Sequence, residues 1–260
     1  MSEITQLKSN IYQFRGEKPS SHVYLLQGSD KNVLIDTGTT SNFPSVSKSL
    51  LKIGLKIKDI HLIILTHEHS DHTGAASHFF NSAVISAHRL AANKIELLDD
   101  FVTMHKHLDT ADKQFYAHIW LEDNMLIDLG NRKLTIIHTP GHTSGCICIY
   151  DTGEGLLFSG DTVFANGALS DIAASGNISD YVYSLEKLNT MKITELYPGH
   201  GRISTNPEQD IRQAVGHARK MMDESKVLFE ALTRKTGMPP LIKALFEKST
   251  PKAENKQKNQ

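Results

Sequence analysis

The sequence predicts one layered α/β domain, in which two strand-rich halves each carry helices in the order αββα, with a helical extension at the C-terminus. Short apolar runs typical of buried strands fall in two blocks, at residues 10–86 and 125–197. Segments with helical periodicity accompany each block. No change in composition separates the blocks, which favours one domain over two independent ones.

The first block contains extended runs separated by Gly and polar turns, and then strands that alternate with helices. We expect strands at residues 10–14, 23–27, 32–36, 62–66 and 83–86. The helices of this block are expected at 74–80, at 87–94, and where Val46, Leu50 and Ile53 share one face.

The second block continues the same domain, which we place at residues 1–205. Strands are predicted at 125–128, 133–139, 146–150, 156–159 and 196–197, and a helix is predicted with Ile178, Tyr181, Val182, Leu185 and Leu188 on one face. Between the blocks, residues 97–124 form a predicted helical insertion. Its spaced apolar side chains are explained equally by packing and by a lid over an apolar substrate pocket.

The C-terminal part begins as a helix at Pro207, because Asn206 is a suitable N-cap and Gln209 follows it by three residues. An apolar stripe runs from Ile211 to Leu232, and a short helix is expected at residues 241–246. We expect residues 206–248 to form helices packed on the same domain. The polar, Lys-rich residues 249–260 are expected to be disordered.

The composition favours a globular protein that acts on a small molecule. The formal net charge is −1, so no attraction to nucleic acid or to anionic membranes is expected. No apolar run approaches the ~20 residues that span a bilayer. The N-terminus lacks the basic and apolar regions of a signal peptide, and we expect a cytoplasmic protein. A homodimer is compatible with the sequence.

The most informative motif is HEHSDH at residues 67–72, directly after the apolar run 62–65. With 14 His in 260 residues, the pattern H-x-H-x-D-H arises by chance in roughly two sequences in a thousand of this composition. His67 and His69 can point the same way from an extended backbone, because side chains repeat every two residues along a strand. Imidazoles with a neighbouring carboxylate are typical ligands of divalent metals.

Three further loops place one His or Asp beside Gly at the end of an apolar run. They carry His142, Asp161 and His200. Gly permits the tight turns and close backbone approach that such loops need. Loops at strand ends are a common place for binding residues, so we expect these side chains to join the motif at residues 67–72.

With these motifs, the chain resembles the metallo-β-lactamase superfamily over roughly residues 10–205. LIDTG at residues 34–38 matches a further signature of that family. The resemblance implies a four-layer αββα metallo-β-lactamase sandwich with the metal ions at one edge. It also implies ligand roles: a first metal held by His67, His69 and His142, a second held by Asp71, His72 and His200, and Asp161 bridging both.

The chemistry of these ligands agrees with two divalent metal ions, for which Zn is our first expectation and Fe or Mn the alternatives. Seven ligands exceed the needs of one tetrahedral ion, but suit two ions that share a carboxylate. Two metals ~3.5–4 Å apart can hold a bridging hydroxide as the nucleophile. Asp71 is placed to accept its proton, so Asp71 and Asp161 are the predicted catalytic residues.

Other polar residues have more ordinary interpretations. Asp36 either holds the tautomer of a metal-bound His or only structures its own turn. His105 and His107 form a second H-x-H pair, but without a strand or a Gly turn, and we expect no metal there. Cys146 and Cys148, two apart on a predicted strand, are expected to be buried core residues.

We expect hydrolysis of an ester-like bond, in a lactone or a thiolester, because the motifs resemble those of both glyoxalase II and acyl-homoserine lactonases. Residues 166–171 lack the cation of the glutathione segment of glyoxalase II, which counts against glutathione thiolesters. The alternatives are a mononuclear iron sulfur dioxygenase of the same fold, and a β-lactamase or a phosphodiesterase or nuclease. A metal-binding module without enzymatic activity is disfavoured, because structural sites are closed and tetrahedral.

Overall fold

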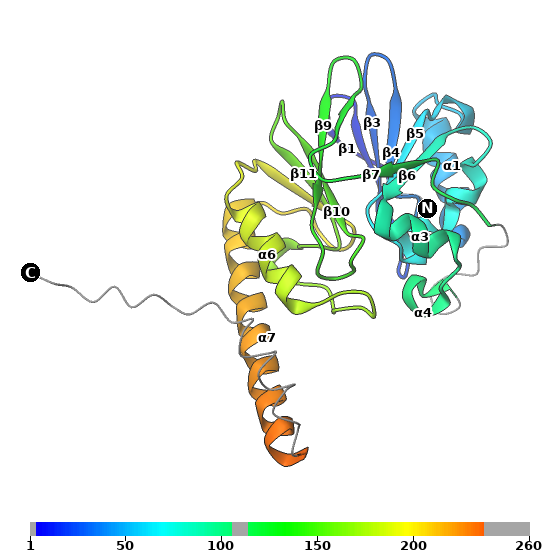
Figure 1. Cartoon of the computed structure of the whole chain (residues 1–260). Helices are drawn as coiled ribbons and strands as arrows, with labels where there is room; N and C mark the ends of the chain where they lie inside the picture. Colours follow the sequence, from blue (N-terminus) through cyan, green and yellow to red (C-terminus); the bar gives the residue numbers. More distant parts are fainter. Residues whose placement is uncertain (1–3, 106–113, 237–260) are drawn as a thin grey trace, which may run out of the picture. The chain divides into compact units, whose positions relative to one another are not determined.

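Two β-sheets form the centre of the computed structural model, which describes residues 4–105 and 114–236, with side chains through residue 231 (Figure 1). The seven-stranded sheet has the order β1-β2-β3-β4-β5-β6-β7, and the five-stranded sheet has the order β12-β11-β10-β9-β8. The strands of the first sheet are β1 Ile4–Lys8, β2 Ile11–Phe14, β3 Val23–Gln27, β4 Asn32–Ile35, β5 Leu62–Leu65, β6 Val84–His88 and β7 Ile119–Leu121. Those of the second are β8 Leu126–Asp128, β9 Lys133–His138, β10 Ile147–Asp151, β11 Leu156–Gly160 and β12 Glu195–Pro198.

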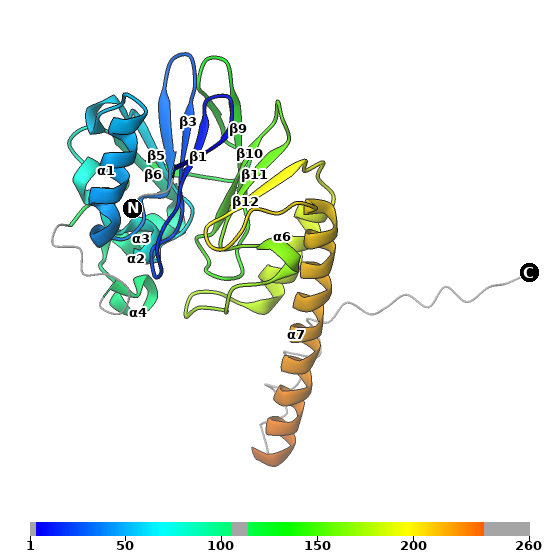
Figure 2. The ribbon, with the colours of Figure 1, turned by 180° about the vertical axis from the view of Figure 1, so that it is seen from behind.

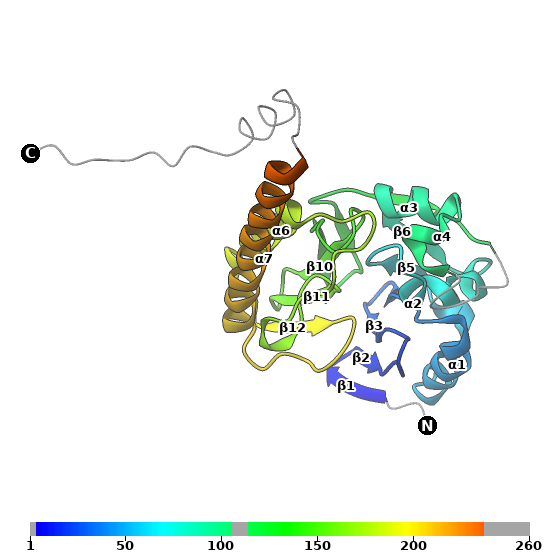
Figure 3. The ribbon, with the colours of Figure 1, turned by 90° about the horizontal axis from the view of Figure 1, so that it is seen from below.

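Helices cover the outer face of each sheet, as the view along the strands shows (Figure 3). The seven-stranded sheet carries α1 (Phe43–Lys52), α2 (Ser70–Thr73) and α3 (Arg89–Glu96). The five-stranded sheet carries α6 (Ile178–Asn189), and α7 (Pro207–Thr236) begins beside α6, where Arg219 pairs with Glu186 at 2.7 Å (Figure 2). The predicted αββα arrangement is therefore confirmed.

The apolar runs of the sequence are continuous at strands such as β5 because those strands are buried on both faces. Along β5, Ile63 and Leu65 face the helices of the first sheet, whereas Leu62 and Ile64 face the second sheet. The layer between the sheets also contains Tyr24 and other large side chains: Phe158, Tyr197, Leu134, Ile136 and Ile149. A run without polar alternation thus indicates a strand that lies between two packed layers.

Strand direction brings the candidate metal loops to one edge of the sandwich. β4, β5 and β6 are parallel, so their carboxyl ends lie at the same edge. Asp36 follows β4, and the loop at residues 67–72 follows β5. In the second sheet β11 and β12 are parallel, and Asp161 and His200 follow them. Ligands of α/β sheets typically bind at such carboxyl ends.

The element predictions match the structure except at weakly patterned segments. The predicted strands and the main helices are found within a few residues of their predicted bounds, although residues 74–79 form a 3-10 helix rather than an α-helix. β1 and β7 were not predicted. Residues 97–124 contain the helical turn α4 (Asp100–Thr103) and the edge strand β7, and their use as a lid stays a prediction.

The C-terminal predictions are only partly within the described residues. The chain divides into a compact unit of residues 1–219 and a second unit of residues 220–260, and α7 runs across that division. In the first unit Ile211, Ala214 and Ala218 are buried. Packing of all residues 206–248 on the domain stays a prediction, and the helix at 241–246 and the tail at 249–260 lie outside the described residues. No described helix is both long and apolar enough to cross a membrane.

Tyr24 connects the two sheets close to the His200 loop. Its hydroxyl donates to the Pro198 carbonyl oxygen at 2.7 Å and accepts from Gln13 Nε2 at 3.1 Å, in the buried layer between the sheets. We expect Tyr24→Phe to lower the free energy of unfolding by about 1–3 kcal/mol, because two buried polar groups lose their partner. Urea unfolding measures this change. The exposed Tyr183→Phe is the control, and an equal loss in both variants would contradict the role of Tyr24.

Candidate metal centre

Asp36 fixes the start of the motif at residues 67–72. It follows β4 in the left-handed conformation, with φ of 59°. Its carboxylate accepts hydrogen bonds from Thr66 N and Thr66 Oγ1, both at 2.8 Å, and contacts His72 Nδ1 at 2.7 Å. A proton on His72 Nδ1 leaves Nε2 to face the other ligand candidates. Of the two interpretations of Asp36, the contacts support the one in which it orients an imidazole, because its carboxylate contacts Thr66 and His72.

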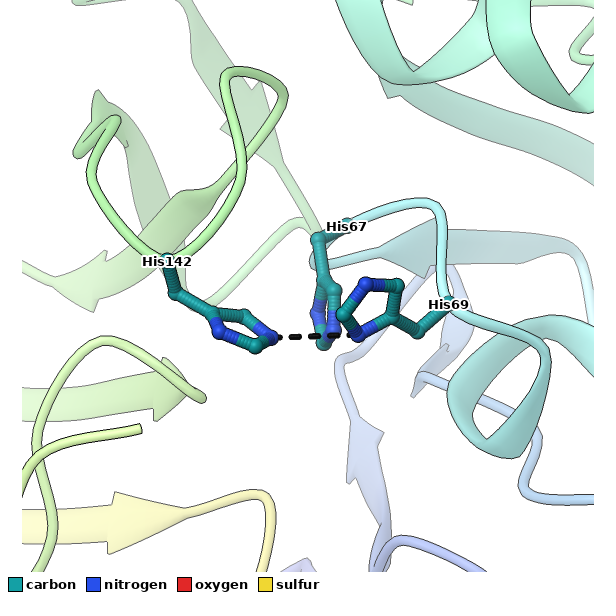
Figure 4. Close-up of side chains that lie close together, drawn as sticks. All are labelled: His67, His69 and His142. Atoms are coloured by element: carbon teal, nitrogen blue, oxygen red, sulfur yellow. Dashed lines mark hydrogen bonds between the residues drawn. The ribbon is translucent and has the colours of Figure 1, made fainter. Parts of the chain in front are cut away.

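The first ligand set is a group of three imidazoles, shown in Figure 4. His67 and His69 come from the segment between β5 and α2, and His142 comes from the β9–β10 loop of the other sheet. His142 Nε2 lies 3.1 Å from His69 Nδ1. His142 Nδ1 donates to the Asp171 carbonyl oxygen, so Nε2 keeps its lone pair for a ligand. The ligand nitrogens of all three lie within 4.8 Å of one another.

The second ligand set joins Asp71, His72 and His200. His200 Nε2 lies 3.0 Å from Asp71 Oδ2 and 3.1 Å from His72 Nε2. A third group contains Asp161 together with His67 and His72, which is one member of each set. Asp161 thus lies close to one member of each set. All seven side chains that the sequence predicted are brought together at one sheet edge.

The position of Gly199 shows how closely these side chains approach the backbone. A Cβ atom at residue 199 would lie 2.6 Å from both Asp161 Oδ1 and His72 Cε1. Real Cβ contacts are longer, so a larger residue would displace two ligand candidates. Gly in the loop after β12 is therefore a requirement of the site and not only of the turn.

Two imidazoles of the first set, those of His67 and His69, are held in the neutral form that binds metals. Burial lowers the pKa of His67 well below its ordinary value, and the neighbouring imidazoles lower it further. Burial and then the nearby charge of His142 lower the pKa of His69 to about 4. Both rings are thus neutral at neutral pH, and each has one nitrogen lone pair available to a cation.

The second set is held together by carboxylates that stay ionised. Burial raises the pKa of Asp161, but the imidazoles of His72 and His200 outweigh burial and keep it below its ordinary value. Burial lowers the pKa of His72, whereas Asp161, Asp36 and Asp71 together raise it well above its ordinary value. The site thus favours a positive charge at its centre, where a metal ion can replace the proton of His72.

The donor set fits a cation at this position. Four ligand candidates each have a fully buried polar atom without a hydrogen-bond partner among the described residues: His67 Nε2, His69 Nε2, Asp71 Oδ1 and Asp161 Oδ1. Buried polar atoms in native proteins nearly always have partners, so partnerless atoms on four side chains of the metal-type groups fit a bound cation. Imidazole nitrogen and carboxylate oxygen are the atoms that Zn, Fe and Mn accept.

Sequence reasoning missed two groups that support the ligands. Thr66 connects Asp36 to the motif, and the Asp171 carbonyl oxygen orients His142. A backbone carbonyl from a distant loop leaves no signal in a sequence. Among the other histidines, His88 and His138 stack on each other, and His105 belongs to none of the three metal-type groups. His107 lies outside the described residues.

Comparison with known proteins agrees with this geometry. The family model described as the metallo-beta-lactamase superfamily matches residues 17–200, which include all seven ligand candidates. The chain belongs to the metallo-β-lactamase superfamily. It is 31% identical over 209 residues to the human acyl-coenzyme A thioesterase MBLAC2, a match that covers 69% of this chain and 72% of the relative.

Two further matches extend the comparison. A protein of Methanocaldococcus jannaschii named as a probable metallo-hydrolase is 35% identical over 205 residues, covering 74% of this chain and 93% of the relative. A crystal structure of a metallo-β-lactamase family protein from Thermus thermophilus has a TM-score of 0.70 at 22% identity, covers 84% of this chain and 82% of the other, and shows the shared fold. This metallo-β-lactamase superfamily member is a metal-dependent hydrolase.

Asp36 is expected to control the second ligand set through His72. In Asp36→Asn, an NH₂ group replaces one of the carboxylate oxygens that accept from Thr66 and His72, so at least one of the three present contacts is lost. Loss of such an outer contact typically weakens metal binding about 10–100-fold. Competition with a chromophoric chelator measures the affinities of both ions, and the weaker binding is expected at one of them. Unchanged affinity for both ions would contradict the orienting role.

Proposed function

We propose that this protein hydrolyses thioesters, with acyl-coenzyme A compounds as the substrate class, by means of two divalent metal ions. The observation that carries the proposal is the position of Asp161, which groups with one member of each ligand set. The family and a relative named as an acyl-coenzyme A thioesterase support the reaction type. Zn is the expected metal, with Fe or Mn as alternatives.

The proposed ligand roles follow the three groups of side chains. His67, His69 and His142 hold the first ion, and Asp71, His72 and His200 hold the second. Asp161 bridges the two. These side chains come from both sheets, so the site exists only when the sandwich is assembled.

The metal ions would supply a hydroxide nucleophile at neutral pH and polarise the thioester carbonyl. The protein contributes positioned groups around that reaction. Asp71 Oδ1 is buried and has no partner among the described residues, so it can accept the proton of the attacking water. The pKa of Asp71 stays below its ordinary value: burial raises it, but His72 and His200 outweigh burial. Asp71 is therefore ionised and ready to act as a base at neutral pH.

Thioester hydrolysis is preferred here over lactone hydrolysis because of the relative's activity. The lack of a cation at residues 166–171 also counts less against an anionic thiol carrier than the sequence alone indicated. Residues 166–171 contain no cation, but Arg202 of the loop after β12 donates to Asn166 Oδ1 at 2.5 Å. A cation is therefore present beside this segment, and an anionic thiol carrier is compatible with the site. A cytoplasmic location and a homodimer stay predictions.

A substrate panel tests the reaction. Purified protein loaded with Zn or Mn is assayed against acyl-coenzyme A thioesters of graded chain length, acyl-homoserine lactones, a chromogenic β-lactam and a phosphodiester. Thiol release from the thioesters is expected to give the highest kcat/KM. The length preference will indicate how much apolar acyl chain the site holds. A lactone or β-lactam with a higher kcat/KM than every thioester would overturn the proposal.

Metal content tests the ligand roles. We expect about two equivalents per chain in the native protein and one or fewer in Asp161→Ala, with turnover at least about 100-fold lower. A chelator should abolish activity, and added Zn should restore it in the native protein alone. The control is Asp128→Ala, an exposed carboxylate on β8. A single iron per native chain would instead favour the sulfur dioxygenase, and full turnover of Asp161→Ala with two metals would refute the bridging role.

A further inference from the structure

Glu68 stands between two ligand candidates but makes its contacts elsewhere. Its side chain is completely buried, and it belongs to none of the three metal-type groups. Oε1 accepts hydrogen bonds from Lys94 Nζ at 2.8 Å and from Ser175 Oγ at 2.9 Å. Oε2 accepts one from Thr143 Oγ1 at 2.8 Å. A buried carboxylate is costly unless it is hydrogen-bonded, so three donors to one carboxylate indicate a specific structural role.

These donors come from three separate parts of the chain. Lys94 lies on α3, Thr143 lies in the β9–β10 loop directly after His142, and Ser175 lies in the segment before α6. Lys94 Nζ also donates to Ser144 Oγ in the β9–β10 loop. We call this group of Glu68, Lys94, Thr143 and Ser175 the Glu68 clasp.

The space around the carboxylate is as specific as its hydrogen bonds. A Cβ atom at residue 145 would lie 2.5 Å from Glu68 Oε2 and 2.7 Å from Ala91 Cβ. Gly145 and the small Ala91 therefore leave the room that the clasp occupies. Substitution of either by a larger residue would force apart α3 and the β9–β10 loop.

The clasp connects the two halves of the first ligand set. Glu68 is joined by peptide bonds to both His67 and His69, and its partner Thr143 directly follows His142. The segment that carries Ser175 also carries Asp171, whose carbonyl oxygen accepts from His142 Nδ1. The distance and angle between the imidazoles from the two sheets are thus held by one carboxylate and its donors. An outer contact of this kind controls how well a preformed site fits a metal ion.

We propose that Glu68 is a positioning residue, and that the Glu68 clasp sets the metal affinity of the site formed by His67, His69 and His142. This inference rests on the ligand roles in the proposed function. It assigns to Glu68 no contact with metal or substrate. Glu68 affects metal affinity by fixing the position of residues 67–69 relative to the β9–β10 loop.

The main test is Glu68→Gln, which keeps the side-chain volume but removes the negative charge that faces Lys94. Cobalt and zinc affinities are measured on the full chain by chelator competition, and the visible spectrum of the cobalt form reports the ligand geometry. We expect about 10–100-fold weaker binding at one of the two sites and an altered cobalt spectrum. This measurement needs no substrate, so it is independent of the proposed reaction.

The matched control is Asp151→Asn, which removes a second buried carboxylate that pairs with Arg132. Asp151 lies at the far end of β10 from the β9–β10 loop, roughly 15 Å along the strand. Both variants are expected to unfold at lower urea concentration, but Asp151→Asn should change metal affinity by less than about twofold. Equal metal affinity in Glu68→Gln and native protein would overturn the inference, and a native chain that binds no metal would instead overturn the proposed function.

A second pair of variants covers the case in which Glu68→Gln does not fold. Thr143→Val keeps the shape of the side chain but removes the hydroxyl that contacts Glu68, whereas Thr143→Ser retains it. We expect about 10-fold weaker metal binding in Thr143→Val and near-native affinity in Thr143→Ser. The same affinity in both variants would show that the clasp does not position the ligands.

Discussion

The contacts of Thr66 are the constraint on which the rest of the site depends. Its backbone N–H and its hydroxyl both donate to Asp36, and its carbonyl oxygen accepts from Ile147 N of the other sheet at 2.8 Å. One residue therefore fixes the end of β5 to β4 and to β10 at once. The motif at residues 67–72 starts from this point. Because the backbone at the start of this motif is fixed, the imidazoles of His67 and His69 are preorganised to lie beside His142 from the opposite sheet.

A cluster of buried histidines and carboxylates is stable only if its charges compensate. Burial alone would lower the pKa of His72 and raise the pKa of Asp71 and Asp161. Their mutual attraction reverses this, and it leaves ionised carboxylates around an imidazole whose proton a metal ion can replace. At His67 and His69 burial and the neighbouring imidazoles prevail, although Asp71 and Glu68 raise the pKa of His69, and both rings stay neutral. The two ligand sets therefore differ in charge: the first contains the neutral imidazoles of His67 and His69, and the second contains an ionised carboxylate. Both sets are built from residues 67–72 together with one distant loop each.

How much of this could be read from the sequence depends on whether a feature is local. The strands between the two layers were predictable, because burial on both faces produces continuous apolar runs such as residues 62–65. The seven ligand candidates were predictable for a similar reason, since each His or Asp stands beside Gly or a dense motif at the end of such a run. β1 and β7 were not predicted; both are short strands at the edges of the seven-stranded sheet, and most of their side chains are at least partly exposed. The partners of Glu68 were beyond prediction, because Lys94, Thr143 and Ser175 meet only through the tertiary fold.

The metal ligands of a hydrolase define its reaction chemistry more closely than its substrate. In metal-dependent hydrolases a bound metal activates water and polarises a carbonyl, and this chemistry serves esters, thioesters and lactams alike. Discrimination must then come from groups that touch the rest of the substrate, and these lie on loops rather than on the strands. The contact of Arg202 with Asn166 illustrates the difference: it adds a cation next to a segment that has none of its own, and no motif marks it. The substrate class therefore depends on long-range contacts of loops, which leave no local motif in the sequence. For this reason the motifs identify the reaction chemistry more sharply than the substrate.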